Sequence, residues 1–343
     1  MKWNASEVIK PPGFQVDKSE KEKHMKFRHQ AFLFTPAVLL ACALLAAPVE
    51  AQFFQQGPKL AGTGAIGASS QQGWSISLSG DGNTAIVGGY GDNGEVGAAW
   101  VFTRSDGVWS QQAKLVGTGA IGPALQGISV SISSDGNTAI VGGFNDDNAG
   151  ASWIFTRSRG VWTQQAKLVG TGAIGNAQQG YSVALSSDGN SAIVGGYDDD
   201  EGVGAAWMFI RSGERWAQEA KLVGTGAIGN TQQGYSVAIS GDGNTAIVGG
   251  PDDNDYVGAA WVFTRSSDGV WAQQGSKLVG TGAVGVFVRQ SWSVYLSDNG
   301  NTAVVGGQGD EGTTGLGVGA AWVFTRSGGV RSQQGPNWWV QAM

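Results

Sequence analysis

Cysteine and histidine are almost absent from this chain. Its 343 residues include one cysteine, Cys42, and two histidines, His24 and His29. All three lie before residue 52, in a segment that we expect to be removed on secretion. The remaining chain would then offer no histidine-based triad, thiol nucleophile, disulfide or ordinary zinc site. Most nucleophilic and zinc-dependent enzyme classes are thereby excluded.

Residues 25–51 have the three-part layout of a secretory signal peptide. A short basic stretch precedes an apolar run over residues 31–47, and a V-E-A sequence then resembles a small-residue cleavage site. The apolar run is shorter than the roughly 20 residues of a membrane span. Residues 1–24 are polar and are expected to be a disordered extension. We therefore predict a secreted, periplasmic or cell-surface protein. An uncleaved signal anchor or a lipid are the alternatives that would attach it to a membrane.

Positive charge is also scarce in the expected mature chain. Residues 1–51 hold 7 of the 21 basic and 5 of the 27 acidic residues, so their removal leaves 14 basic and 22 acidic residues and a net charge of −8. Proteins bind nucleic acid largely by neutralising phosphates with basic side chains. An acidic domain without a basic patch is not expected to bind nucleic acid.

Glycine, by contrast, is abundant, with 58 residues, and much of it recurs in a fixed motif. The sequence GTGAIG fits the G-x-G-x-x-G pattern of dinucleotide-binding folds, which requires a strand before it and a helix after it. Here a strand-like alternation follows, and one cofactor needs only one such loop. The motif begins five times, with valine for isoleucine in the last copy, at Gly62, Gly117, Gly170, Gly224 and Gly280. This repetition predicts an architectural unit and no dinucleotide site.

Each unit contains four strand patterns. In the unit that begins at Gly180, the segment YSVALS alternates large and small residues, as a strand does. An Asp-Gly turn, a short AIVG strand and an acidic loop follow. The aromatic-rich strand GAAWMF comes next, and a second turn leads to a strand that begins at Trp216. No helical pattern interrupts the units.

Four antiparallel strands per unit predict an all-β fold, a β-propeller of five repeats over residues 52–333. A β-solenoid is the alternative, although its units are shorter. We expect residues 53–60 to complete the last blade of a five-bladed ring, and an incomplete larger ring is the alternative. Residues 334–343 depart from the repeat and are expected to form an irregular tail.

The recurring sequence motifs of this chain resemble bacterial FG-GAP repeats, the family that also builds the integrin α-subunit propeller. The "FG" element corresponds to the QGYSV sequence around Gly180, and the "GAP" element to Gly249-Gly250-Pro251. The recurring AWVFTRS and W-x-Q-Q-x-K-L words also resemble the bacterial branch. The family's phenylalanine is absent, and the alanine of GAP is glycine here. The resemblance implies a propeller over residues 53–333 but no particular function.

In that family the loop after the GAP element can hold calcium, which takes six to eight oxygen ligands in proteins. The corresponding five loops of this chain are acidic, but none contains the family's full nine-residue pattern. Asp and Asn also suit solvated turns, so both interpretations stay open. The candidate ligands for Ca²⁺ are Asp198, Asp200, Asp252, Asp253, Asp255, Asp92, Asp146 and Asp147.

The acidic loops and the GTGAIG crossovers are expected at one face. In an up-and-down sheet, the loop between the second and third strands and the crossover after the fourth strand leave the same edge. Together they would form an acidic, glycine-rich face suited to a cation or a polar ligand.

The composition and the resemblance favour a non-enzymatic binding or adhesion module for an extracellular protein or glycan ligand. A structural scaffold, or a fragment of a larger surface protein, is the first alternative. A glycoside-acting enzyme is the second, but it needs a distinct pair of carboxylates about 5–9.5 Å apart. The acids of this chain recur in every loop and are absent from the first strand of the unit, residues 181–186. We therefore expect no enzymatic activity.

Overall fold

The structure is a computed structural model that describes residues 53–311 and 317–335. Residues 55–343 form one compact unit, separate from residues 1–54, and the description below concerns that unit. The expected signal peptide and most of the C-terminal tail lie outside the described residues. Among the described residues, no helix has the length and apolar character needed to cross a bilayer.

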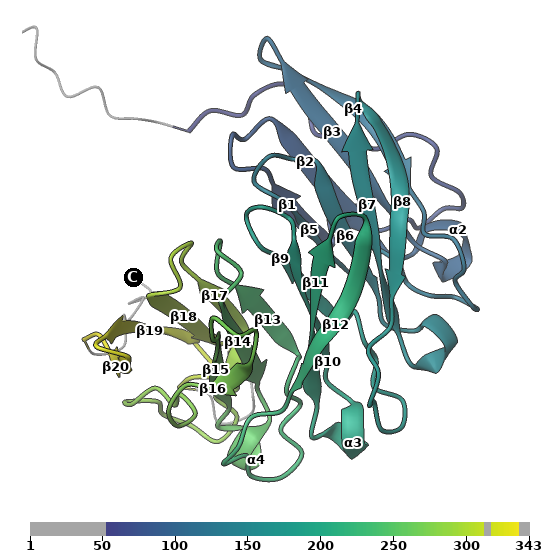
Figure 1. Ribbon diagram of the computed structural model, residues 1–343. Coiled ribbons are helices and arrows are strands. Elements are labelled where there is room, and N and C mark those ends of the chain that lie inside the picture. Colours follow the sequence, from purple (N-terminus) through teal and green to yellow (C-terminus); the bar gives the residue numbers. More distant parts are fainter. Residues whose placement is uncertain (1–52, 312–316, 336–343) are drawn as a thin grey trace, which may run out of the picture. The chain divides into compact units, whose positions relative to one another are not determined.

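Each repeat forms one four-stranded antiparallel sheet, and the five sheets, here called blades 1 to 5, follow in chain order (Figure 1). This arrangement confirms the predicted all-β fold of five four-stranded repeats. Blade 1 consists of β1 (Ser75–Leu78), β2 (Thr84–Gly89), β3 (Ala98–Ser105) and β4 (Val108–Leu115). Blade 2 consists of β5 (Ser129–Ile132), β6 (Thr138–Gly143), β7 (Ala151–Ser158) and β8 (Val161–Leu168). Blade 3 consists of β9 (Ser182–Leu185), β10 (Ser191–Gly196), β11 (Ala205–Ser212) and β12 (Arg215–Leu222).

Blades 4 and 5 have the same strand order. Blade 4 consists of β13 (Ser236–Ile239), β14 (Thr245–Gly250), β15 (Ala259–Arg265) and β16 (Trp271–Gln273). Blade 5 consists of β17 (Gln290–Leu296), β18 (Thr302–Gly307), β19 (Ala320–Ser327) and β20 (Val330–Gln333). In blades 1 to 4 a short turn links the second and third strands: α2 (Asp92–Glu95), η1 (Asp146–Asn148), α3 (Asp199–Gly202) and α4 (Asp253–Tyr256). Residues from all five first strands line one cavity of about 280 Å³, so these strands are the innermost.

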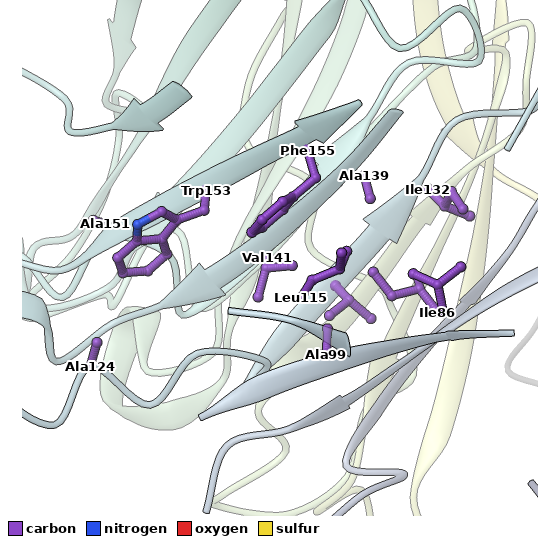
Figure 2. Packing of buried hydrophobic residues seen from close by; sticks show 12 residues of the cluster. Ile86, Ala99, Leu115, Ala124, Ile132, Ala139, Val141, Ala151, Trp153 and Phe155 are labelled. Atoms are coloured by element: carbon purple, nitrogen blue, oxygen red, sulfur yellow. The ribbon is translucent and has the colours of Figure 1, made fainter. Parts of the chain in front are cut away.

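The core lies between consecutive blades. Figure 2 shows the first of these interfaces, in which Ile86 and Ala99 of blade 1 pack with Val141, Trp153 and Phe155 of blade 2. Three further clusters join blades 2 to 3, 3 to 4 and 4 to 5 in the same way. Each of blades 2 to 4 therefore has apolar side chains on both faces of its sheet, and each face packs against a neighbouring blade.

The first strands of the first and last blades have exposed outer faces, whereas Trp100 and Phe102 on the third strand of blade 1 are buried. Ile76 and Leu78 of blade 1 are 74% and 56% exposed, and Tyr295 of blade 5 is 68% exposed. The fourth strand of blade 5 is β20, from the C-terminal part of the chain. The prediction that residues 53–60 complete the last blade is therefore wrong. Gln56 instead accepts a hydrogen bond from Arg104 of blade 1, at 3.0 Å. The exposed end faces agree with the incomplete-ring alternative.

Candidate binding face

The GTGAIG crossovers lie against the acidic loops, as expected. In each blade the N–H of the motif's Ile, or Val284 in blade 5, donates to one carboxylate oxygen of an aspartate that is at most 3% exposed. The N···Oδ1 distances are 2.7–2.9 Å for Ile66–Asp92, Ile121–Asp146, Ile174–Asp199, Ile228–Asp253 and Val284–Asp310. The repeated motif is therefore a structural joint between crossover and loop.

The glycines of the motif are explained by packing and backbone conformation. A Cβ on Gly170 would lie 2.2 Å from Trp207, and the other four first glycines face a tryptophan of their own blade in the same way. The second and third glycines of this copy, Gly172 and Gly175, have φ of 77° and 70°, which favours glycine. The Trp207 indole N–H also donates to the Thr171 carbonyl at 2.9 Å. These requirements account for a G-x-G-x-x-G pattern without a phosphate.

In blades 1 to 4 a lysine pairs with the buried aspartate; it lies in the fourth strand in blades 1 to 3 and four residues after β16 in blade 4. Its ammonium lies 2.5–2.6 Å from the second carboxylate oxygen in the pairs Lys114–Asp92, Lys167–Asp146, Lys221–Asp199 and Lys277–Asp253. In blade 3 the same ammonium donates to the Gly172 carbonyl at 2.7 Å and lies 5.4 Å from the Trp207 ring centroid. We call this arrangement of aspartate, lysine and tryptophan the lysine clamp.

The clamp changes the interpretation of three calcium candidates. Asp92, Asp146 and Asp253 each have one oxygen bonded to a backbone N–H and the other paired with an ammonium. The backbone N–H and the lysine ammonium are both hydrogen-bond donors, and they occupy the carboxylate oxygens that a cation would need as ligands. These donor sets do not fit a calcium ion.

The remaining five candidates lie around the buried aspartates. Asp147, Asp200 and Asp255 are exposed and have φ of 49–55°, a left-handed conformation that Asp tolerates better than most residues. Asp198 accepts a hydrogen bond from Gln178 at 3.2 Å, and Asp252 lies 3.4 Å from Arg289. Burial raises the pKa of Asp252, and the Arg289 guanidinium partly opposes that shift. Among the described residues, no three acidic side chains gather as a metal site would require.

Two of the five buried aspartates, Asp199 and Asp310, are absent from the candidates that the sequence analysis selects. That reasoning selected Asp198 and Asp200 on either side of the buried residue. The signal was available, because the buried aspartate is always the third residue after the Gly-Gly pair that ends the second strand. The position within the repeat therefore predicts which aspartate is buried, whereas the number of acidic residues in a loop does not.

The same face carries an aromatic cluster that the sequence analysis did not identify. Side chains at the start of the first strands meet side chains that follow the second strands, and all are half-buried. The members are Phe144, Tyr181, Tyr197, Tyr235 and Trp292, with centroid separations of 4.6–5.7 Å. Burial raises the pKa of Tyr197 and of Tyr235, so both phenols are neutral hydrogen-bonding groups at ordinary pH.

A cavity of about 300 Å³ lies beside this cluster. Its lining combines amide, carboxylate and phenol side chains from Asn230, Gln232, Asp252, Asp255 and Tyr256, together with Ile228 and Gly229. Arg289 connects the two features, because its guanidinium lies 5.1 Å from the Tyr256 ring and 5.6 Å from the Trp292 ring. Arg289 therefore contacts one aromatic ring of the cavity lining and one ring of the cluster.

The opposite face consists of the Asp-Gly turns. Asp81, in the turn of blade 1, accepts hydrogen bonds from the Ser79 hydroxyl and the Asn83 backbone N–H. These bonds lower its pKa to about 2. Burial tends to raise the pKa of the equivalent carboxyls in blades 2 to 4, but the same hydrogen bonds outweigh it, and the pKa values of Asp135, Asp188 and Asp242 are lowered.

Comparison with protein families gives one match. The FG-GAP repeat model matches residues 162–209 and 216–263. Each match begins in the fourth strand of one blade and ends in the third strand of the next, so it includes one crossover and one acidic loop. The chain contains FG-GAP repeats. The predicted resemblance is thereby confirmed at two positions. A comparison with curated proteins finds no match.

The FG-GAP repeats of this chain adopt a fold similar to several solved structures. A candidate 6-phosphogluconolactonase of Bacteroides uniformis aligns with a TM-score of 0.53 and 14% identity, over 78% of this chain and 72% of the other. A functionally unknown protein of Desulfotomaculum acetoxidans gives 0.50 and 12%, over 76% and 68%. The periplasmic gluconolactonase of Pseudomonas aeruginosa gives 0.48 and 18%, over 76% and 69%. At these identities the likeness concerns the fold alone.

Proposed function

We propose that this FG-GAP repeat protein is a secreted or cell-surface binding module without enzymatic activity, and that its ligand is a glycan. The observation that carries the proposal is the cavity lined by Tyr256, which Arg289 connects to the aromatic cluster. Small-molecule sites are concave, combine aromatic surface with a few polar groups, and are largely formed before the ligand arrives.

The lining chemistry suits a sugar ring. A pyranose has an apolar face, which can lie on the exposed ring of Tyr256, and a rim of hydroxyl groups that both donate and accept hydrogen bonds. Asn230 and Gln232 supply donors and acceptors, while Asp252 and Asp255 supply acceptors. Tyr256 is 37% exposed; its ring centroid lies 5.1 Å from that of Phe287, and the Arg289 guanidinium lies 5.1 Å from the tyrosine ring. These contacts hold the tyrosine in place before binding.

Binding of the full chain to an array of immobilised mono- and oligosaccharides, followed by calorimetry on the best ligand, tests this proposal. We expect Tyr256→Ala to weaken binding at least tenfold and Tyr256→Phe, which keeps the ring, to retain most of the affinity. Val161→Ala is the matched control, since Val161 is exposed on β8 of another blade. Equal affinity for Tyr256→Ala and the control would move the site elsewhere, and binding to no glycan would contradict the ligand class. Hydrolysis of the bound glycan would support the glycoside-acting alternative.

A further inference from the structure

Consecutive blades are joined by a repeated series of polar contacts between their first strands. A serine hydroxyl on one first strand accepts a hydrogen bond from a backbone N–H at the free edge of the next. The N···Oγ distances are 3.0–3.2 Å for Ile132–Ser77, Val183–Ser129, Leu185–Ser131, Val237–Ser182 and Val294–Ser236. The small, polar half of each first strand is thus one side of an interface that points toward the next blade.

A second series runs through the Asp-Gly turns. In it, a backbone N–H of one blade donates to a carbonyl of the next at 2.7–2.9 Å, in the order Gly80 to Ser134, Ser134 to Ser187, Ser187 to Gly241, and Gly241 to Asp298. The series has a direction, because each blade donates forward. Gly80 is the first donor of the series, and no described blade precedes it to donate to its own carbonyl. Asp298 is the last acceptor, and no described blade follows it to accept from its N–H.

The two ends of the array therefore carry opposite halves of the same interface. Blade 1 presents Ile76 and Leu78, the counterparts of Val130 and Ile132, which pack against the preceding blade in the first interface. Blade 5 presents Val304, the counterpart of Ile86, and the exposed Ser293, the counterpart of Ser236. In every internal interface the equivalent apolar side chains are buried.

We propose that two copies of this chain associate head to tail, with the outer face of blade 5 of one copy against the outer face of blade 1 of the other. The Ser293 hydroxyl would then accept from the Ile76 N–H of the second copy, and the Asp298 N–H would donate to its Gly80 carbonyl. Such a contact is heterologous, since different surfaces meet, so it leaves one free end of each kind and can add further copies.

One residue of blade 5 departs from the internal pattern. Tyr295 stands where the other blades have a small side chain, Ser77 in blade 1 and Ala184 in blade 3. Tyr295 also lines the central cavity, as does Leu78 of blade 1, so its ring has space on the axial side of the interface. We expect it to weaken the association without preventing it. A tyrosine at this position would limit the length of the assembly, because a contact between copies that fits poorly dissociates more readily than one that fits as well as the contacts between blades of one chain.

The test is disulfide trapping in the full chain with Cys42 replaced by serine, which leaves no native cysteine. Ile76→Cys and Ser293→Cys are made as separate variants, mixed and oxidised. We expect a disulfide-linked dimer in the mixture and none in either variant alone. The matched control is the internal pair Ser236→Cys with Val294→Cys in one chain, which shows whether this register permits a disulfide at all.

Two outcomes of the trapping experiment would overturn the proposal. The first is an internal pair that oxidises while the mixed variants do not. The second is dimers of either single variant, which would show a symmetric contact. A second measurement is sedimentation equilibrium over a range of concentrations. Ile76→Glu should weaken association at least tenfold, Tyr295→Ser should strengthen it, and the thermal melt of Ile76→Glu should be unchanged because Ile76 is exposed. Concentration-independent monomers of the native chain and of Tyr295→Ser would also contradict it.

Discussion

Blades 1 to 4 and blade 5 have the same strands but not the same joints. In the first four blades a buried aspartate faces a lysine ammonium at 2.5–2.6 Å. In blade 5 the equivalent Asp310 is 1% exposed, and its Oδ2 has no hydrogen-bond partner among the described residues. By its position after the Gln-Gln pair, Asn337 stands where blade 4 has Lys277, and it lies outside the described residues. Blade 5 thus keeps the aspartate, whereas asparagine replaces the lysine at the equivalent position of the sequence.

A second difference concerns the outer edge. Trp109, Trp162, Trp216 and Trp271 stand opposite an arginine in blades 1 to 4, and Arg331 takes their place in blade 5. Burial, with the nearby charge of Arg326, lowers the pKa of Arg331 to about 10. Its Nε and Nη1 are buried and have no hydrogen-bond partner in the described part of the chain. Both departures from the repeat occur in blade 5, after which the described part of the chain has no further blade.

The largest expected effect comes from breaking a complete clamp. Lys221→Met leaves the Asp199 carboxylate buried without its cation, and removing one partner of a buried pair typically costs about 3 kcal/mol or more. Unfolding in urea, monitored by tryptophan fluorescence, measures the loss. The double variant Lys221→Met with Asp199→Asn should recover part of it. A loss below about 0.5 kcal/mol, the size of an exposed pair, would show that the clamp contributes little.

A smaller gain is expected from restoring the clamp in blade 5. Because residue 337 has the sequence position of Lys277, Asn337→Lys should supply an ammonium to Asp310, whose Oδ2 has no hydrogen-bond partner among the described residues. We expect the free energy of unfolding to rise by about 1.5–3 kcal/mol, the usual value of a hydrogen bond to a charged group. Asn337→Met, similar in length but uncharged, is the control. If both variants gain equally, packing rather than charge explains the effect, and the comparison between blades fails at this position.

The Asp-Gly turns predict a dependence on pH. Their aspartates have pKa values below the unfolded value of about 3.9, so the stability they add is present above that pH and is lost as pH falls through the folded pKa, about 2 for Asp81. Blade 5 has Asn299 here, which accepts the same two hydrogen bonds without titrating.

The quadruple variant Asp81→Asn, Asp135→Asn, Asp188→Asn, Asp242→Asn should therefore lose less stability than the native chain between pH 6 and pH 2.5. Urea midpoints at the two pH values measure the difference. Identical losses in both proteins would assign the acid sensitivity to other carboxylates.

The smallest effect is expected from calcium. Because ammonium groups occupy the clamp aspartates, the melting temperature of the chain should change by no more than the error of the measurement, about 1 °C, between millimolar calcium and excess EDTA. A ligand that binds only the native state would raise it. A clear upward shift that disappears in Asp200→Ala with Asp255→Ala would place a cation at the exposed carboxylates and restore the calcium hypothesis.

Much of the fold could be predicted because it depends on residues near one another in the sequence. Alternation such as that of Val183 and Leu185 predicts a strand, and Asp188-Gly189 predicts its turn. The acidic loops were placed correctly beside the crossovers, from strand order alone. The candidate site was harder to predict. Tyr256 belongs to the fourth repeat and Arg289 and Trp292 to the fifth, and no local sequence pattern links them. Their meeting depends on how blade 4 packs on blade 5.

By itself, the sequence determined the repeat, its four strands and the face on which its loops gather, since hydrophobic periodicity and turn chemistry act over a few residues. The pairing of Asp199 with Lys221 and the exposure of Ile76 and Tyr295 on the two end blades depend on tertiary packing. Local periodicity is the same whichever side chain is buried or however many blades complete a ring. The choice between a carboxylate that meets an ammonium and one that meets solvent is made by the packing of segments some 20 residues or more apart.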